Sequence, residues 1–450
     1  LNWTNADAEA DQLDIRWGDE IRLGLRVVFD YPLIDLDLWN RIVDEFSIPR
    51  RNQAGQGGSQ RPLWPDLSLL SVRADQLRVL NTRLDQAVLR ATRTPQEHWS
   101  LNLRSEQTTG TLKWQERDGQ VMGRMAGRFD RLSVGDDADD TRSLLPDAQI
   151  DDDATVDDDL DLPGIVLQAD DLRLFGHSVG ALSLEGVRDA GRHTWRLDRL
   201  QIGDDNAVLR GTGMWRLRGP DRGLDLKAEV SAKNMGAWMS RAGYPDVLAG
   251  GEGVLKGALQ WRDLPWTRDK AKLAGTLEFS LDKGRFQKVG SRTAKLLEVL
   301  SLQSLMRLNR LDQGLVSLTQ DGFPFDQLRG ALTLDNGMMQ ARDYKVIGPV
   351  ATILLEGSSN ILDETLNLQA VIVPNLDVSG AALAAGIAIN PLVGLGAFVT
   401  QWLLKTPLAK AMTVRYHVTG TWDEPVIRDA PVSATAASSG ADLSRSPKSP

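Results

Sequence analysis

In the stretch KLAGTLEFSLD, residues 272–282, polar and apolar residues alternate almost one by one, and this pattern indicates the fold class,. In an extended strand, successive side chains point to opposite faces. One face of this stretch would therefore carry Leu273, Gly275, Leu277, Phe279 and Leu281. The opposite face would carry Lys272, Thr276, Glu278, Ser280 and Asp282. A period of two residues is typical of a β-strand with one buried and one solvated face.

The same alternation recurs along the chain. It is present in GLDLKAEVS, residues 223–231, and in TLNLQAVIV, residues 365–373. LDNG at 334–337 and LDKG at 281–284 have the composition of turns between such runs,. The sequence therefore predicts a mainly β fold made of antiparallel meanders.

Two parts of the chain resemble each other. RADQLRV at 73–79 matches QADDLRL at 168–174, and EHWSLNL at 97–103 corresponds to RHTWRLDRL at 192–200. A further strand with a tryptophan near its end follows in each part, at Trp114 and Trp215. This spacing favours duplicated strand units stacked along one sheet, although chance similarity between short β patterns is an alternative.

Charge is distributed unevenly. The formal net charge is -9, but residues 135–161 hold 12 Asp and one Arg, which leaves the rest of the chain near +2. Without a basic patch interleaved with aromatic residues, no nucleic-acid partner is expected. The chain has no Cys, so disulfides and thiolate metal sites are excluded,. It begins at Leu1 without a signal sequence, so we expect a longer protein with its targeting segment upstream,.

Few helices are expected. Apolar residues at helical spacing predict one helix over 291–311, and MGAWMSRAG after Asn234 predicts a shorter one,. The Asp-rich segment 135–162 is interpreted as a loop, and 429–450, rich in Ser, Ala and Pro, as a disordered tail,. These segments separate β regions at 1–134, 163–243 and 244–428.

The longest uncharged run, residues 378–404, includes AALAAGIAINPLVGLGAFVTQWLL at 381–404. Asn390-Pro391 is suited to starting a second helix, so two helices of about 10 and 14 residues are expected within 380–404. At about 15 and 21 Å, each is shorter than the bilayer core of about 30 Å. A buried helical hairpin and a membrane-inserting hairpin remain equal alternatives.

Motifs for catalysis and metal binding are weak. GHSVG at 176–180 fits the G-x-S-x-G pattern of a hydrolase, but a strand-like ALSLEG follows Ser178 where the pattern needs a helix,. The histidines His98, His177, His193 and His417 lack metal-ligand spacing,. No catalytic residue, metal or cofactor is therefore predicted.

Several stretches together resemble the C-terminal region of the YhdP branch of AsmA-like envelope proteins. The similarity is dense over 244–428 and looser upstream. It rests on the order and spacing of YPDVLAGGEGVLKGALQW at 244–261, KLLEVLSLQSLMRL at 295–308, GFPFDQLRGALTL at 322–334, YKVIGPVATILLEGSSNILDETLNLQAVIVPNL at 344–376 and YHVTGTWDEPVI at 416–427.

This resemblance implies a long, twisted sheet that curls into an elongated apolar groove across the periplasm of a Gram-negative bacterium. It implies phospholipid as cargo, an inner-membrane anchor upstream of this chain and short apolar helices that meet the outer membrane. The residues expected to contact the membrane or the groove end are Leu383, Ile387, Ile389, Leu392, Val393, Leu395, Phe398, Val399, Trp402 and Leu403.

Two other functions remain as alternatives: a structural scaffold with a packed β core and a protein-docking hairpin, and, less favoured, a hydrolase that uses Ser178. Because a slip of one residue in strand register exchanges the two faces, the pattern alone assigns no strand residue to lipid contact.

Overall fold

The computed structural model describes strands and their connections in residues 25–35, 67–79, 82–93, 98–117, 120–135, 163–189, 194–217, 221–245, 247–262, 270–287, 323–349, 351–374, 414–422 and 424–429. The chain forms two compact units. Unit 1 comprises residues 1–245 and 254–269, and unit 2 comprises residues 246–253 and 270–450. Nearly all the described residues are in strands, so the mainly β prediction is confirmed.

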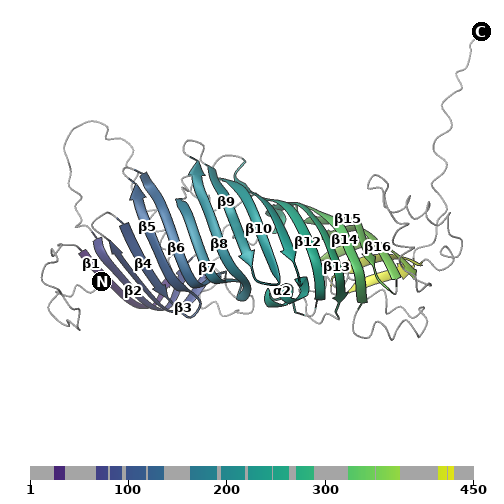
Figure 1. Ribbon diagram of the computed structural model, residues 1–450, viewed down its shortest axis with the longest axis horizontal. Helices are drawn as coiled ribbons and strands as arrows, with labels where there is room; N and C mark the ends of the chain where they lie inside the picture. Colours follow the sequence, from purple (N-terminus) through teal and green to yellow (C-terminus); the bar gives the residue numbers. More distant parts are fainter. Residues whose placement is uncertain are drawn as a thin grey trace, which may run out of the picture. The chain divides into compact units, whose positions relative to one another are not determined.

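In unit 1, neighbouring strands follow one another in chain order (Figure 1). They are β1 (Leu25–Asp35), β2 (Leu67–Val79), β3 (Thr82–Arg93), β4 (His98–Arg104), β5 (Thr109–Arg117), β6 (Gln120–Val134), β7 (Gly164–Leu174), β8 (His177–Asp189), β9 (Thr194–Gly203), β10 (Ala207–Arg216) and β11 (Gly223–Ala232). The short helix α2 (Met235–Arg241) follows β11.

The strands of unit 2 also pair in chain order, each antiparallel to the next from β13 onward. They are β13 (Leu273–Phe286), β14 (Phe323–Asp335), β15 (Met338–Ile347), β16 (Ala351–Asn360), β17 (Thr365–Pro374), β18 (Val414–Thr421) and β19 (Pro425–Asp429), preceded by the 3-10 turn η1 (Lys270–Lys272). Strand β12 (Leu248–Trp261) contributes residues to both units.

The sheet of unit 1 is mixed, which the expected antiparallel meanders did not include. Strands β1 and β2 pair in parallel, and so do β6 and β7. Parallel neighbours need a connection that returns along the whole strand, so a tight turn cannot join them. The Asp-rich segment that starts at Gly135 supplies that connection between β6 and β7.

The parallel junctions mark the start of a repeat of five strands, β2 to β6 and then β7 to β11. The echoed sequences 73–79 and 168–174 lie in β2 and β7, the first strand of each repeat. Trp99 and Trp195 lie in the third strands, β4 and β9. Trp114 and Trp215 lie in the fourth strands, β5 and β10. The prediction of duplicated strand units is therefore confirmed.

The two predicted turns have different outcomes. In LDNG, Asn336 and Gly337 have φ of 49° and 75° and join β14 to β15, as a tight hairpin with two left-handed residues requires,. The prediction of a turn at LDKG is wrong, because β13 continues through it to Phe286. Lys283 takes a φ of 54° inside the strand, and the pairing with β14 resumes at Gly284.

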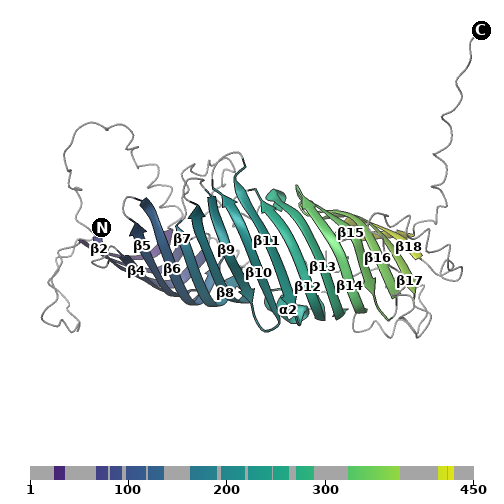
Figure 2. The same ribbon diagram turned by 45° about the horizontal axis from the view of Figure 1, so that its top comes forward.

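The predicted helix after Asn234 is confirmed as α2, which lies at one end of the strands of unit 1 (Figure 2). Asn234 caps it, since its side chain accepts a hydrogen bond from the backbone N–H of Ala237 at 3.0 Å,. The indole of Trp238 donates to the carbonyl of Val179 at 3.2 Å and holds α2 against β8.

The helix predicted at 291–311, the hairpin at 380–404, nearly all of the loop at 135–162 and the tail after residue 429 lie outside the described residues. The proposed division into five segments stays a prediction. In the described part of the chain, no helix combines the length and apolar character needed to cross a bilayer.

Candidate functional site: the apolar face of the sheet

Strand register brings the apolar residues of unit 1 onto one face. Across β7 to β11, directly paired residues form a continuous row: Leu167, Leu184, Leu200, Gly211 and Ala228. Each pair in this row shares a face of the sheet, because cross-strand partners point to the same side. The alternation seen in single strands thus becomes an apolar surface that crosses strand boundaries.

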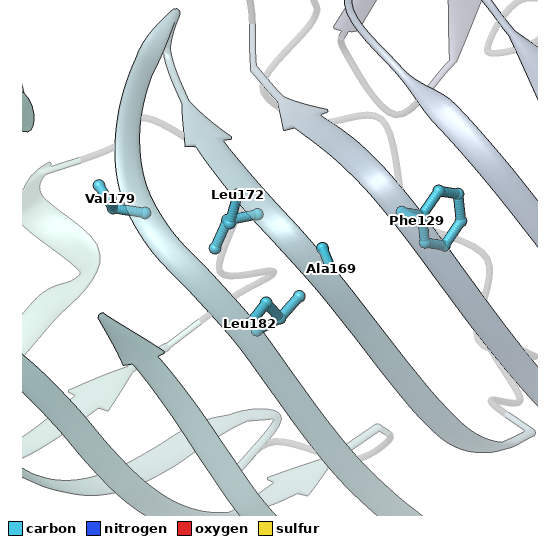
Figure 3. Packing of buried hydrophobic residues seen from close by; sticks show 5 residues of the cluster. All are labelled: Phe129, Ala169, Leu172, Val179 and Leu182. Atoms are coloured by element: carbon cyan, nitrogen blue, oxygen red, sulfur yellow. The ribbon is translucent and has the colours of Figure 1, made fainter. Parts of the chain in front are cut away.

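One part of this surface is centred on five buried side chains from β6, β7 and β8 (Figure 3): Phe129, Ala169, Leu172, Val179 and Leu182. It lies towards the end of the strands where α2 packs. A second part lies towards the opposite end and contains Trp195, Leu197, Trp215 and Leu217.

The described residues do not fully cover this apolar surface. Leu167, Leu184, Leu200 and Ile202 pack against these clusters but are only partly buried. A sheet face covered by a second layer would have its apolar side chains fully buried. These side chains keep surface that a further apolar partner can cover, and covering it is favourable at about 25 cal/mol per Å².

The opposite face of the same strands carries paired charges. Arg128 bonds to Asp170 at 2.6 Å between β6 and β7, and Arg199 lies 3.2 Å from Glu185 between β9 and β8. On β9, the carboxylate of Asp198 raises the pKa of Arg196. Such exposed pairs add little stability, so this face is best described as solvated.

Unit 2 has its own apolar face. Leu281, Leu328, Val346, Ile353 and Ile372 are paired in sequence across β13 to β17 and are at most 6% exposed. Tyr344 lies beside this row, with its ring packed edge-on against Phe279 at 5.7 Å between centroids. Burial raises the pKa of the Tyr344 phenol, so it stays neutral.

At one end of unit 2, the second face is buried as well. Thr352, Leu354, Val371 and Val373 are between 2% and 6% exposed, although they alternate with residues of the first face. The segments that follow Gln287 and Pro374 leave and return at this end, as the pairings of β13 with β14 and of β17 with β18 require. The described strand ends Pro374 and Val414 therefore lie where both sheet faces are apolar.

All ten residues predicted to contact the membrane, Leu383 to Leu403, lie outside the described residues. The structure neither brings them together nor separates them. Their assignment stays a prediction.

Ser178 does not have the surroundings of a hydrolase nucleophile. Strand β8 runs through it to Asp189, so no helix follows the serine. Its hydroxyl donates to the Asp171 carboxylate at 2.5 Å and accepts from Arg241 at 2.9 Å. Burial acts to raise the pKa of Asp171, but hydrogen bonds from Ser178 and Arg173 outweigh it and the pKa is lowered. The serine therefore donates to an ionised carboxylate and belongs to a structural polar network.

The histidines do not form a metal site among the described residues, where no group of three potential ligands occurs. His417 Nε2 lies 2.8 Å from Asn367 Oδ1 across β18 and β17, a pairing on the strand surface. His193 lies outside the described residues.

Register supplies what the sequence pattern did not, namely which strand residues line the apolar face. The phase of the alternation contained part of this signal, because Leu89, Ala91 and Arg93 lie two residues apart on β3. The position of Arg93, in phase with Leu89 and Ala91, would have placed an arginine on the apolar face, and the sequence analysis did not use this signal.

Together these observations define a class of protein whose β-sheet, in unit 1, repeats a group of five strands in mixed orientation and presents one apolar and one charged face. The chain belongs to the YhdP family, because the family model described as "YhdP protein" matches residues 1–427. It is 34% identical over 172 residues to the "Intermembrane phospholipid transporter YhdP" of Escherichia coli (strain K12). That alignment covers 38% of this chain and 13% of the relative, so the chain spans a small part of it. No solved structure matches the chain significantly.

Proposed function

We propose that this chain is a lipid-carrying segment of an intermembrane phospholipid transporter, with acyl chains held along the apolar face. The observation that carries the proposal is the row from Leu167 to Ala228, which continues over five strands. The similarity of the chain to a relative named as a phospholipid transporter supports phospholipid as the cargo.

The physical basis is the match between a sheet with one apolar face and an amphiphile. Acyl chains on the apolar face are removed from water, while charged headgroups stay hydrated. Because the apolar residues continue from strand to strand, a lipid can move between neighbouring positions without losing its apolar contacts. The transfer needs no bond to be formed or broken, so we assign no enzymatic step.

A photo-crosslinking experiment tests this proposal with neighbouring residues as matched controls. Leu184 and Leu200 point to the apolar face, whereas Glu185 and Arg199 are paired on the opposite face. Each is replaced in turn by benzoylphenylalanine in the full chain, which is incubated with phospholipid vesicles and irradiated. Mass spectrometry then counts covalent phospholipid adducts.

We expect adducts at positions 184 and 200 and few at 185 and 199. Equal labelling at all four positions would indicate nonspecific association. No labelling at any position would favour the alternative of a packed scaffold with no lipid cargo.

We further propose that the segment 380–404 contacts the outer membrane and that the chain works in the periplasm, anchored to the inner membrane by a part of the protein outside this sequence. The absence of charge from residue 378 to residue 404 supports the membrane contact. Trp402, followed by Lys405 and Lys410, is placed as an interfacial anchor would be,.

Replacing Leu395 and Phe398 by Asp tests this contact. We expect binding to liposomes to be lost while the β signal in circular dichroism is unchanged, because a charged side chain in the bilayer costs about 2.5–3.5 kcal/mol. A matched double change to Ala keeps the segment uncharged and should retain most of the binding. Undiminished binding by the Asp variant would refute the contact.

A further inference from the structure

The apolar face of unit 1 ends in a repeated set of three residues. In the first repeat, Arg93 of β3 is paired with Trp99 of β4, which is paired with Trp114 of β5. In the second repeat, Arg188 of β8 is paired with Trp195 of β9, which is paired with Trp215 of β10. We call these two sets the Arg–Trp–Trp rows.

The two rows occupy equivalent places. In each, the arginine is on the second strand of the repeat and the tryptophans are on the third and fourth strands. Both rows lie at the end of the strands opposite α2, since β8 runs from Val179, which contacts α2, to Arg188. One rim of the apolar face therefore repeats the same chemistry.

These arginines lie on the apolar face and not on the charged one. Arg93 follows Leu89 and Ala91 at intervals of two residues, and their cross-strand partners are Leu103 and Leu101. Arg188 follows Gly186, whose partner is Leu197. Each row therefore places a guanidinium at the edge of an apolar surface.

The tryptophans add buried hydrogen-bond donors to the rim. Trp195 and Trp215 are 5% and 6% exposed, and Trp195 Nε1 donates to the carbonyl of Pro163 at 2.9 Å. Trp114 Nε1 is buried and has no acceptor in the described part of the chain. Trp261 Nε1 is also buried without an acceptor among the described residues, and the Trp261 carbonyl would lie 2.4 Å from a Cβ added to Gly223, at the start of β11.

A buried N–H without an acceptor costs about 1–3 kcal/mol, so these donors favour a ligand that brings an oxygen to the rim. Arginine is suited to phosphate because its planar group can donate two parallel hydrogen bonds. Indoles prefer places where an apolar surface meets a polar one. The ligand that meets all three conditions is an amphiphile with a phosphodiester and ester oxygens joined to apolar chains.

We propose that the Arg–Trp–Trp rows are repeated subsites for the phosphate and glycerol ester of a phospholipid, so that headgroups follow this rim while acyl chains extend towards α2. The inference rests on the proposed lipid-carrying function and adds an orientation to it. Leu182 lies six residues from Arg188 along β8, about 20 Å at a strand rise of 3.3 Å,. An extended acyl chain whose phosphate is at Arg188 reaches that part of the face.

Two photoactivatable phosphatidylethanolamines test the orientation, one with a diazirine on the headgroup and one with a diazirine at the end of an acyl chain. Each is loaded into the full chain from vesicles, and crosslinked peptides are mapped by mass spectrometry. We expect the headgroup probe to label peptides containing Trp99, Trp114, Trp195 or Trp215. We expect the acyl probe to label the peptide containing Val179 and Leu182.

Variants then test the role of the arginines. In Arg93→Gln combined with Arg188→Gln, we expect headgroup labelling at the rim to fall about tenfold, as the loss of charge-assisted hydrogen bonds predicts, while acyl labelling persists. Arg93→Lys combined with Arg188→Lys should restore part of it. Arg199→Gln, on the charged face, is the matched control and should leave labelling unchanged. Circular dichroism and thermal unfolding identify any variant that has not folded, and wild-type labelling decides the orientation independently of the variants.

Free glycerol 3-phosphate separates a lipid subsite from a site for free phosphate esters. In excess it should not displace the lipid, and displacement would overturn the assignment to lipid. Headgroup labelling spread over both ends of the strands would overturn the rows as subsites but leave the lipid-carrying function intact. Absence of labelling by both probes would overturn that function and the subsites with it.

Discussion

At the scale of single residues, the rim of the apolar face depends on close contacts that only small residues permit. A Cβ added to Gly186 would lie 2.1 Å from Cζ2 of Trp195, so the indole of Trp195 lies directly over this glycine. The indole is also fixed by its hydrogen bond to Pro163. Gly186 is therefore part of what holds the second Arg–Trp–Trp row in place.

Gly186→Ala should destabilise the protein by about 1–3 kcal/mol, because a buried indole must move to admit the methyl group. The midpoint of urea unfolding, followed by tryptophan fluorescence, measures the loss. Gly164→Ala in the neighbouring strand is the control, since the nearest atom to its added Cβ lies 3.8 Å away. Equal stability of the two variants would show that Trp195 has room to shift.

The ionisation of Lys345 makes the stability of unit 2 depend on pH. Burial, together with the nearby charge of Arg329, lowers the pKa of Lys345 to about 8. Below this pH, lysine is charged in both folded and unfolded chains, and the folded state carries the full cost of burying the ammonium. Between about pH 8 and the ordinary value of 10.5, the folded state releases its proton while the unfolded state keeps it, so stability rises with pH,.

We expect the wild-type protein to gain stability relative to Lys345→Met as the pH is raised from 8 to 10. Denaturant unfolding of both proteins across this range gives the difference. Other titrating groups, including Tyr344, are common to both and cancel. Parallel stability curves would mean that the Lys345 ammonium is solvated in the folded state.

At the scale of elements, α2 illustrates how a seven-residue helix persists at the end of a sheet. Its cap at Asn234 and the Trp238 contact with Val179 are joined by an ion pair between Arg241 and Asp204. Burial acts to raise the pKa of Asp204, but backbone N–H groups of Ala207 and Asn206 lead the opposing contributions, and the pKa is lowered. The helix is thus tethered at both ends.

Asn234→Ala should destabilise α2 by about 1 kcal/mol, because the Ala237 N–H loses its acceptor,. Hydrogen exchange of the α2 amides reports this locally. Ser240→Ala, an exposed position in the same helix, should leave exchange nearly unchanged. Unaltered exchange in Asn234→Ala would assign helix stability to the Trp238 contact.

Elements of this chain were predictable where the information is local. Alternation predicted strands such as β13, and the capping residue Asn234 predicted the start of α2. LDKG misled because its composition suits a turn, whereas one left-handed residue, Lys283, is accommodated inside a long strand. Register and the parallel junctions depend on contacts between distant residues, so no local pattern contains them. For the rim arginines the local pattern contained only their phase with apolar residues, because the tryptophans opposite them follow from register.

At the scale of the whole molecule, chain length between strands limits how the sheet can grow. Val134 ends β6, while Gly164 begins β7 opposite Arg124, about 33 Å back along the strand at a rise of 3.3 Å per residue,. Any connection between them must cover that distance. The Asp-rich segment is long enough, and its charge is not required for this role.

Replacing the twelve Asp residues of the segment 136–162 by Ser should therefore preserve the pairing of β6 with β7. Shortening the connection to six residues, which reach at most about 25 Å, should abolish it. Hydrogen exchange of β7 amides distinguishes the two outcomes. Retained protection in the shortened protein would show that these strands can pair in another way.

The parallel junction between β6 and β7 also sets a direction. If all strands were joined by hairpins, a repeat of five strands would be followed by a repeat whose strands run the opposite way. Equivalent residues would then alternate between opposite ends of the strands. Because β7 pairs in parallel with β6, β2 and β7 run in the same direction, and so do the other equivalent strands of the two repeats. Under the proposed lipid-carrying function, a lipid that passes from the first repeat to the second would meet the same order of groups in both, without turning end over end.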